Sequence, residues 1–487
     1  MKSLAQQTSI LIICRFITYS ILFVTPVFLV RILTIEDYGK YREFMLYATL
    51  LCNLSGFSVN ASIMYFIPKY GDNKKYISNS IIIMIFVTVV DVFFLILFKD
   101  IINKNTSFEF FVVLILYICI FLNFNFCEQY WIATKKTHYV LYYNSIKMTF
   151  RSVVVIGCAL YYHSIIFIIY SLVFVELVRF IFVFIYALKQ KIINFKIDFF
   201  SIKEQSSYFI PVGLSNFIFY FNKELSKFFI LYTLGVEYLA YYSIGAYQIP
   251  VIGIIRSSIG DIIFPEVCNR SNNDKKKGLE LWKKTNIIYV ALILPFFVIF
   301  YYYSEFFIKF LFTEKYLNAV IIFKIYMFLM IKECFEMGIP LRSVNKNIYY
   351  MYGSVLAVIT NIILLILFHK TSDYVLPAVA YVFSDVVMTL YMGKKVLETY
   401  AIKIKNLFYW EKIVKIVYLS LIPIPLLYLE KIFNLNNLVE FILFSSLYMF
   451  SYTLLLVKSK IYELTFIYMK IKRNIIIIYN NQKLKIY

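Results

Sequence analysis

The chain has 487 residues, of which 61% are hydrophobic and only 16% are charged. Soluble domains are near half apolar and about a quarter charged, so this sequence has too little polar surface for a water-soluble fold. Its net charge of +21 is interrupted by long apolar segments, and the positive-inside rule explains that charge better than nucleic-acid binding does. The composition therefore predicts an all-α polytopic membrane protein.

Apolar segments long enough to cross a bilayer follow one another along the whole chain. They predict about 14 transmembrane helices, near residues 9–30, 43–67, 77–98, 109–132, 139–162, 164–188, 206–232, 237–264, 285–304, 317–339, 348–368, 373–393, 412–430 and 438–457. The first segment has no small-residue cleavage site before Arg31 and is interpreted as a retained helix, not a signal peptide.

The loops between these segments predict an orientation. With the N-terminus inside, about 30 of the Lys and Arg residues fall on the cytoplasmic side and about 9 on the opposite side. This bias predicts a multi-pass membrane protein with an even number of spans and both termini in the cytoplasm. The outer loops are short and leave no room for an extracytoplasmic catalytic domain.

Several chemistries find no support in the sequence. The seven cysteines lie singly in or beside apolar segments, and there are only 3 His, so disulfides, metal sites and thiol catalysis are not expected. No P-loop, GxSxG or HExxH motif occurs. We therefore expect no enzyme activity, no catalytic residues, no metal and no cofactor.

A faint internal repeat divides the chain. Leu33 to Tyr41 and Leu234 to Tyr242 both read Leu-x-(Ile/Val)-Glu-x-x-small-x-Tyr, each at an outer turn between two segments. Phe66-Ile67-Pro68 and Ile263-Phe264-Pro265 repeat at a similar offset of about 200 residues, which is typical of transporters built from two related halves. The predicted domains are six-helix lobes at 1–190 and 206–395, a cytoplasmic linker at 191–205, two further helices within 396–457, and a basic cytoplasmic tail at 458–487.

Charged residues inside the predicted helices are candidates for function, because each costs about 2.5–3.5 kcal/mol at the bilayer centre. Cations from both lobes are expected to line a central anion-binding cavity, where Arg and Lys would hold phosphate. The candidate substrate-binding residues are Arg15, Lys147, Arg151, Lys223 and Arg256. The candidate ion-coupling residues are the acids Asp91, Glu128 and Asp385.

A structural interpretation of the same residues stays open. Glu176 with Arg179, Glu224 with Lys227, and Lys332 with Glu336 have the spacing of ion pairs on one helix face, and Arg15 lies where a side chain can snorkel. Salt bridges to these cations would equally explain the acids. For Asn60, Asn216, Asn222 and Asn361 we favour interhelical hydrogen bonds over sugar contacts.

The chain resembles the polysaccharide flippase family, which comprises O-antigen and teichoic-acid-type translocases of the multidrug/oligosaccharidyl-lipid/polysaccharide exporter superfamily. That family has a stretch like Ala-Arg-x-Leu-Gly-x-(Glu/Asp)-x-(Tyr/Phe)-Gly-x-Tyr after its first helix, and here Val30 to Tyr41 reads Val-Arg-Ile-Leu-Thr-Ile-Glu-Asp-Tyr-Gly-Lys-Tyr. Thr34 replaces the usual Gly. Gly56, Phe66 to Tyr70, and the stretch from Tyr208 to Pro265 are also similar to the family.

The resemblance implies two six-helix lobes around a central cavity, with two extra helices at the C-terminal end. It further implies alternating-access transport of an undecaprenyl-pyrophosphate-linked oligosaccharide from the inner to the outer leaflet, for surface polysaccharide biosynthesis. The implied partners are this lipid-linked substrate, membrane lipids, and a polysaccharide polymerase or other pathway proteins, with no nucleic acid.

One alternative function lies within transport, and two belong to other classes. One of these two is a non-transporting membrane scaffold, which the cost of so many buried charges argues against. A multidrug or organic-cation exporter of the same superfamily should have an acidic, aromatic cavity, whereas cations here are at least as numerous as acids. A membrane-embedded polysaccharide polymerase or glycosyltransferase would need an active site in an outer loop, which the loop lengths disfavour.

Overall fold

The computed structural model describes residues 4–56, 59–70, 74–97, 99–100, 107–192, 198–371, 373–432 and 437–461. Throughout these ranges the secondary structure is helical, without strands, as the composition predicts. The side chain of Arg15 and the basic tail beyond Ile461 lie outside the described residues, as does the middle of the predicted linker, 193–197.

The chain forms two compact units. Unit 1 comprises Met1–Pro250, Leu311–Ala319 and Ser354–Asp385, and unit 2 comprises Val251–Phe310, Val320–Gly353 and Val386–Tyr487. The division into six-helix lobes stays a prediction.

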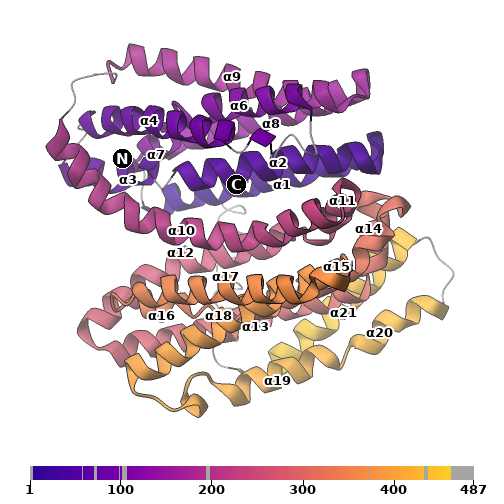
Figure 1. The fold of residues 1–487 in the computed structure, drawn as a ribbon. Helices are drawn as coiled ribbons and strands as arrows, with labels where there is room; N and C mark the ends of the chain where they lie inside the picture. The colour runs from indigo at the N-terminus through magenta and orange to yellow at the C-terminus, as the bar shows by residue number, and fades with distance from the viewer. Residues whose placement is uncertain are drawn as a thin grey trace, which may run out of the picture. The chain divides into compact units, whose positions relative to one another are not determined.

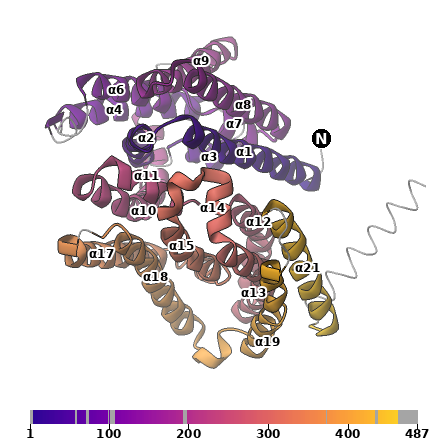
Figure 2. The ribbon, with the colours of Figure 1, turned by 90° about the vertical axis from the view of Figure 1, so that its right-hand side faces the viewer.

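The N-terminal part of unit 1 is a bundle of long helices (Figures 1 and 2). Helix α1 packs along α8, which also contacts α9, and α6 packs against both α9 and α2. The bundle consists of α1 (Leu4–Ile32), α2 (Ile35–Gly56), α3 (Val59–Tyr70), α4 (Lys75–Leu97), α6 (Phe108–Leu122), α7 (Cys127–Ala133), α8 (Thr137–Tyr162) and α9 (Ile165–Lys189).

Unit 1 also contains α10 (Phe199–Thr233) and α11 (Val236–Gly245), the 3-10 helix η1 (Glu314–Ala319), and parts of α17 (Ile348–Phe368) and α18 (Leu376–Tyr400). The short 3-10 helix η2 (His369–Thr371) joins α17 to α18. Asp198 caps the N-terminus of α10, since its carboxylate accepts hydrogen bonds from the backbone N–H groups of Phe200 and Ser201. The same carboxylate forms an ion pair with Lys75 at the start of α4.

The two copies of the repeated motif begin α2 and α11. Thr34 precedes α2, and its hydroxyl accepts a hydrogen bond from the Asp37 backbone N–H at 3.1 Å while donating to the Asp37 carboxylate at 2.8 Å. Thr34 thus caps the N-terminus of α2, and its hydroxyl also binds the Asp37 carboxylate. Gly235 holds the equivalent position before α11, with a φ of 93° that favours glycine. Thr34 and Gly235 therefore occupy equivalent positions before two corresponding helices, and each allows its helix to begin in a different way.

The motif copies also pack against each other, since α2 contacts α11. A Cβ atom built on Gly39 would lie 2.2 Å from the Val236 carbonyl oxygen, so the two backbones approach each other more closely than any other residue would allow. Beside this contact, the fully buried ring of Tyr316 meets the rings of Tyr38 and Tyr241 edge-on, with centroid distances of 6.0 Å to each.

Unit 2 is held together by α13, which contacts α15, α16, α19 and α21. Tyr452 donates a hydrogen bond to the Ala291 carbonyl at 2.9 Å and so ties α21 to α13. The unit contains α12 (Pro250–Asn273) from Val251 onward, α13 (Lys275–Tyr302), α14 (Ser304–Phe312) to Phe310, α15 (Val320–Glu333), α16 (Gly338–Arg342), the remainders of α17 and α18, η3 (Ile404–Asn406), α19 (Trp410–Leu421), α20 (Ile424–Tyr428), η4 (Leu429–Ile432) and α21 (Asn437–Lys458).

Within the described residues, seven helices are long and apolar enough to cross a membrane, and eight if the bent pair of α11 with the start of α12 counts as one span. They confirm a multi-pass membrane protein. The predicted total of about 14 stays a prediction. Helix α8 lies outside the seven spans, as does α10, and both carry several charged residues whose placement decides what the protein can bind.

Candidate functional site

Arg179 on α9 is buried, with 4% exposure, and its role is structural. Its Nε donates to the Glu176 carboxylate at 2.6 Å, which confirms the ion pair predicted from their spacing. Its two terminal nitrogens donate to four backbone carbonyls at the C-terminal end of α6, those of Ile120, Phe121, Asn123 and Phe124, at 2.6–3.3 Å.

Ile120 and Phe121 are in the last turn of α6 and Asn123 is its C-cap, so their carbonyls are among the groups that a helix leaves unpaired when it ends. Phe124 lies just beyond the C-cap. Helix α6 ends at Leu122, inside the apolar segment Phe108–Ala133, where water is not present to satisfy them. A guanidinium at this position also offsets the negative end of the helix dipole. Arg179 therefore holds the break between α6 and α7 together, and its donors are not available to a ligand.

Lys147 and Arg151 share a face of α8 next to this pair, as their spacing of four residues predicts. The Lys147 ammonium lies 6.0 Å from the centre of the Phe121 ring, and Arg151 Nη2 lies 3.8 Å from the Met45 sulfur. Both interact electrostatically with Glu176, which is thus shared by three cations. The structure brings these two candidates together.

A second cationic group, the α2–α10 cluster, consists of Arg42, Lys223, Glu224 and Lys227. Lys227 forms an ion pair with Glu224 at 2.5 Å, as their spacing predicts, and Glu224 also interacts with Lys223 and Arg42. Three cations thus share one carboxylate. The Nε atom of Arg42 is buried and has no hydrogen-bond partner among the described residues, and a buried unsatisfied donor is costly unless an acceptor reaches it.

Tyr41 connects the α2–α10 cluster to α8. Its ring lies beside that of Tyr38, with a centroid distance of 6.0 Å, and Tyr38 in turn interacts with Arg42. Tyr41 also lies within interaction range of Arg151. Positive charge from α2, α8 and α10 therefore gathers around the first turns of α2 inside unit 1.

Arg42 is not among the candidates from the sequence, because it lies just before the predicted segment 43–67. The structure begins α2 at Ile35, so Arg42 belongs to the helix and not to the outer turn. The N-cap residue Thr34 is the signal in the sequence that places it there. Glu43, the first residue of that predicted segment, is also buried, with an oxygen that lacks a hydrogen-bond partner in the described ranges, and is not among the candidates either.

Arg256 lies in unit 2 and is paired. Its Nη1 lies 2.6 Å from a Glu333 oxygen and 3.7 Å from a Glu336 oxygen, and Glu336 is 3.8 Å from Arg342. Arg256 thus lies between two carboxylates, and Glu336 lies between two cations. The charge of Arg256 is compensated within its own unit.

The acidic candidates lie in three different surroundings in unit 1. Asp91 on α4 and Asp385 on α18 are buried, at 8% and 5% exposure. Glu128 is in the first turn of α7, where a negative charge is favoured by the helix dipole, and it interacts with Lys147. No group of three or more His, Cys, Asp or Glu able to hold a metal occurs among the described residues.

Asn222 and Asn361 hold α10 to α17. Asn361 donates to the Asn222 side-chain oxygen at 3.0 Å, and Asn222 donates to the Ser384 hydroxyl on α18 at 3.3 Å. Ser226 donates to the Asn361 oxygen at 3.4 Å. The prediction that these two asparagines act as interhelical hydrogen-bonding groups is confirmed.

Comparisons with solved structures show a fold like that of known membrane transporters. The fold matches one titled "Lipid II flippase MurJ, inward closed conformation" with a TM-score of 0.71 and 14% identity over 93% of this chain and 99% of that one. It matches an outward-facing "multidrug resistance MATE family transporter of the MOP superfamily" with a TM-score of 0.55 and 13% identity over 82% and 97%. A MOP superfamily transporter from Pyrococcus furiosus matches at 0.52 and 12% over 80% and 95%.

The chain belongs to the family described as polysaccharide biosynthesis protein, which matches residues 28–321. This match confirms the resemblance to a polysaccharide family, and the solved structures show that the fold is like theirs. No curated protein sequence matches the chain.

Proposed function

We propose that the protein is a flippase for an undecaprenyl-pyrophosphate-linked oligosaccharide, which it moves from the inner to the outer leaflet of the bacterial cytoplasmic membrane. Membership of the polysaccharide biosynthesis family and a fold like that of a lipid II flippase support this proposal. It rests most on the α2–α10 cluster, where Arg42, Lys223 and Lys227 share the single carboxylate of Glu224.

The physical argument is one of charge balance. A cation within a bilayer costs about 2.5–3.5 kcal/mol unless it is compensated, and this cluster holds more cations than acids. The unsatisfied Nε of Arg42 needs an acceptor, and a pyrophosphate supplies several oxygens with the charge to match. The substrate headgroup would complete the cluster, while its glycan occupies polar space and its lipid remains in the bilayer.

Alternating access requires a contact that opens and closes. The positive-inside orientation puts the turns before α2 and α11 at the outer face, where Gly39 meets Val236 and Tyr316 lies between Tyr38 and Tyr241. We assign to this contact the closure of the outer side, which must separate for the headgroup to leave. Arg256, compensated by Glu333 and Glu336, would bind substrate only after releasing those carboxylates.

The proposal is tested by neutralising the cluster without disturbing its ion pair. Arg42→Gln and Lys223→Gln each remove one charge-assisted contact, worth about 1.5–3 kcal/mol, and should lower the flux of substrate about 10- to 100-fold. Lys189→Gln, which removes an exposed cation from the last turn of α9, is the matched control. Surface glycan and inner-leaflet lipid-linked oligosaccharide would be measured in cells with equal amounts of each variant.

Accumulation of the lipid-linked intermediate with loss of surface glycan in both cluster variants, and not in the control, is the expected result. Normal surface glycan in both would reject the cluster as the pyrophosphate site. If the protein were an organic-cation exporter, the same two substitutions would leave transport unchanged or increase it, because they remove positive charge from the cavity.

A further inference from the structure

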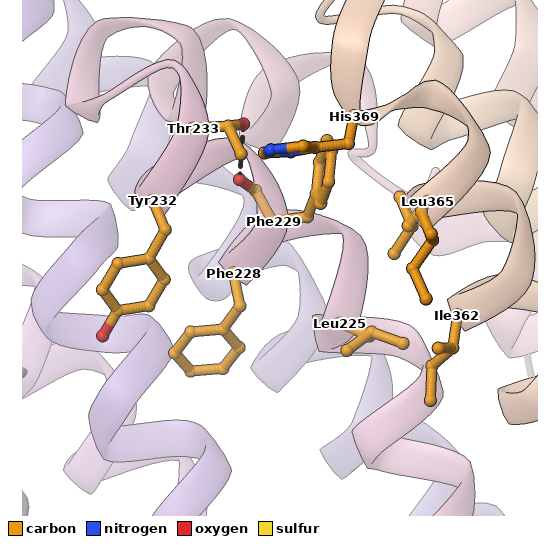
Figure 3. Close-up of a pocket in the computed structure, with 9 residues that line it drawn as sticks. Leu225, Phe228, Phe229, Tyr232, Thr233, Ile362, Leu365 and His369 are labelled. Carbon is orange, nitrogen blue, oxygen red and sulfur yellow. Dashed lines mark hydrogen bonds between the residues drawn. The ribbon is translucent and has the colours of Figure 1, made fainter.

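A groove lies between α10 and α17 within unit 1 and plays no part in the function proposed above. It has a volume of about 460 Å³, and Figure 3 shows its lining side chains. His369 and Thr233 lie at one end, and Leu225 and Ile362 lie at the other. The residues between them are nearly all apolar, and the whole lining consists of Leu225, Phe228, Phe229, Tyr232, Thr233, Ile362, Leu365, Ile366 and His369.

The groove is held open by hydrogen bonds on both sides of α10. The Asn222–Asn361 contact fixes α10 against α17. On the other side, the Tyr232 hydroxyl lies 2.6 Å from that of Tyr47 on α2, whose ring also contacts Phe228. Because polar contacts set the spacing of these helices, the apolar surface between them cannot simply close up.

The dimensions of the groove suit one lipid chain in one leaflet. From Leu225 to Thr233, α10 rises about 12 Å, against about 15 Å for half of a hydrocarbon core. Ile366 is 68% exposed and Ile362 is 38% exposed, whereas Leu365 is 4% exposed and forms the floor. The open side of the groove therefore faces the surroundings of the helix, which in a membrane are lipid.

The polar end of the groove is basic. His369 and Lys370 form the 3-10 helix η2 at the end of α17, and the His369 ring meets the Phe229 ring edge-on, with a centroid distance of 6.0 Å. The His369 ring thus closes one end of the apolar groove, at the level of the helix ends, where lipid headgroups lie. A phosphate there would lie next to His369 and near the positive charge of Lys370.

We propose that this groove is a binding site for an anionic phospholipid, with one acyl chain along Phe228, Phe229 and Ile366 and its phosphate at His369 and Lys370. The site is distinct from the one proposed for the substrate. At 100° per residue, the α10 side chains that line the groove lie about 180° around the helix from Lys223 and Lys227. A lipid held by those lysines cannot place its chain here.

The test uses the full-length protein in nanodiscs and a tryptophan at the rim of the groove. Ile366→Trp places the reporter in the lining, and Leu367→Trp, equally exposed at 66% but outside the lining, is the matched control. Quenching by phosphatidylglycerol brominated on its acyl chains would be compared with quenching by brominated phosphatidylcholine at the same mole fraction, each corrected for the parent protein.

We expect the Ile366→Trp reporter to prefer phosphatidylglycerol about fivefold, the effect of one lysine near an anionic headgroup, and the Leu367→Trp reporter to show no preference. Adding His369→Gln and Lys370→Gln, both at exposed positions, should abolish the preference. Equal quenching by the two lipids at Ile366→Trp would overturn the proposal. Displacement of the brominated lipid by a small mole fraction of polyprenyl phosphate would overturn the assignment to phospholipid.

Discussion

Replacing Gly39 by alanine probes the contact that joins the two copies of the repeated motif. The new methyl group would lie 2.2 Å from the Val236 carbonyl oxygen and 2.7 Å from its carbon. Real Cβ atoms do not approach closer than 3.0 Å, so α2 and α11 must separate by at least about 0.8 Å. Both contacting atoms belong to backbone, and no side chain can rotate away to relieve the overlap.

We expect Gly39→Ala to destabilise the contact between α2 and α11 by the cost of overpacking, which is typically about 1–3 kcal/mol. The separation would also loosen the edge-on contacts of Tyr316 with Tyr38 and Tyr241. Since glycine-to-alanine changes normally stabilise a helix by about 0.5–1 kcal/mol, a net loss here would be specific to the contact. We expect the contact to open about 5- to 150-fold more often.

Amide hydrogen exchange in nanodiscs measures this opening. Peptides that cover α11 should lose protection in Gly39→Ala. The control is Gly157→Ala in α8, where a Cβ would meet nothing within 4 Å and stability should stay equal or rise. If Gly39→Ala protected α11 as well as the wild type does, the close approach of the two motifs would be wrong.

Two further predictions concern other contacts of unit 1. Arg179→Gln should lower stability by about 3–5 kcal/mol, since it leaves the buried Glu176 carboxylate unpaired and the end of α6 uncapped, and thermal unfolding should show a much larger loss than Lys189→Gln. Hydrogen bonds from Lys75 and Ser201 lower the pKa of Asp198 to about 2. The resulting stabilisation of the folded protein is complete above the ordinary pKa of about 4, and it is lost as the pH falls toward 2. Asp198→Asn should therefore flatten the acid limb of a thermal-unfolding titration between pH 4 and 2, and an unchanged limb would contradict the capping role of this carboxylate.

The sequence by itself determined the properties that depend on local spacing. Apolar segments gave the membrane class, because their length matches a bilayer, and a spacing of three residues on one helix was enough to pair Glu176 with Arg179 and Glu224 with Lys227. The motif at Leu33 and Leu234 predicted two related halves. The stretch from Val30 to Tyr41 pointed to the family that residues 28–321 then matched.

Only the tertiary structure decided which charges are already compensated. Arg179 reaches carbonyls 55–59 residues away in the chain, and Arg256 pairs with Glu333, 77 residues away. The periodicity of the sequence shows which residues share a face of one helix. It does not show which helices pack together, and these contacts depend on that packing. For the same reason the α2–α10 cluster, which adds Arg42 to the lysines of α10, and the groove that ends at His369 became visible only in three dimensions.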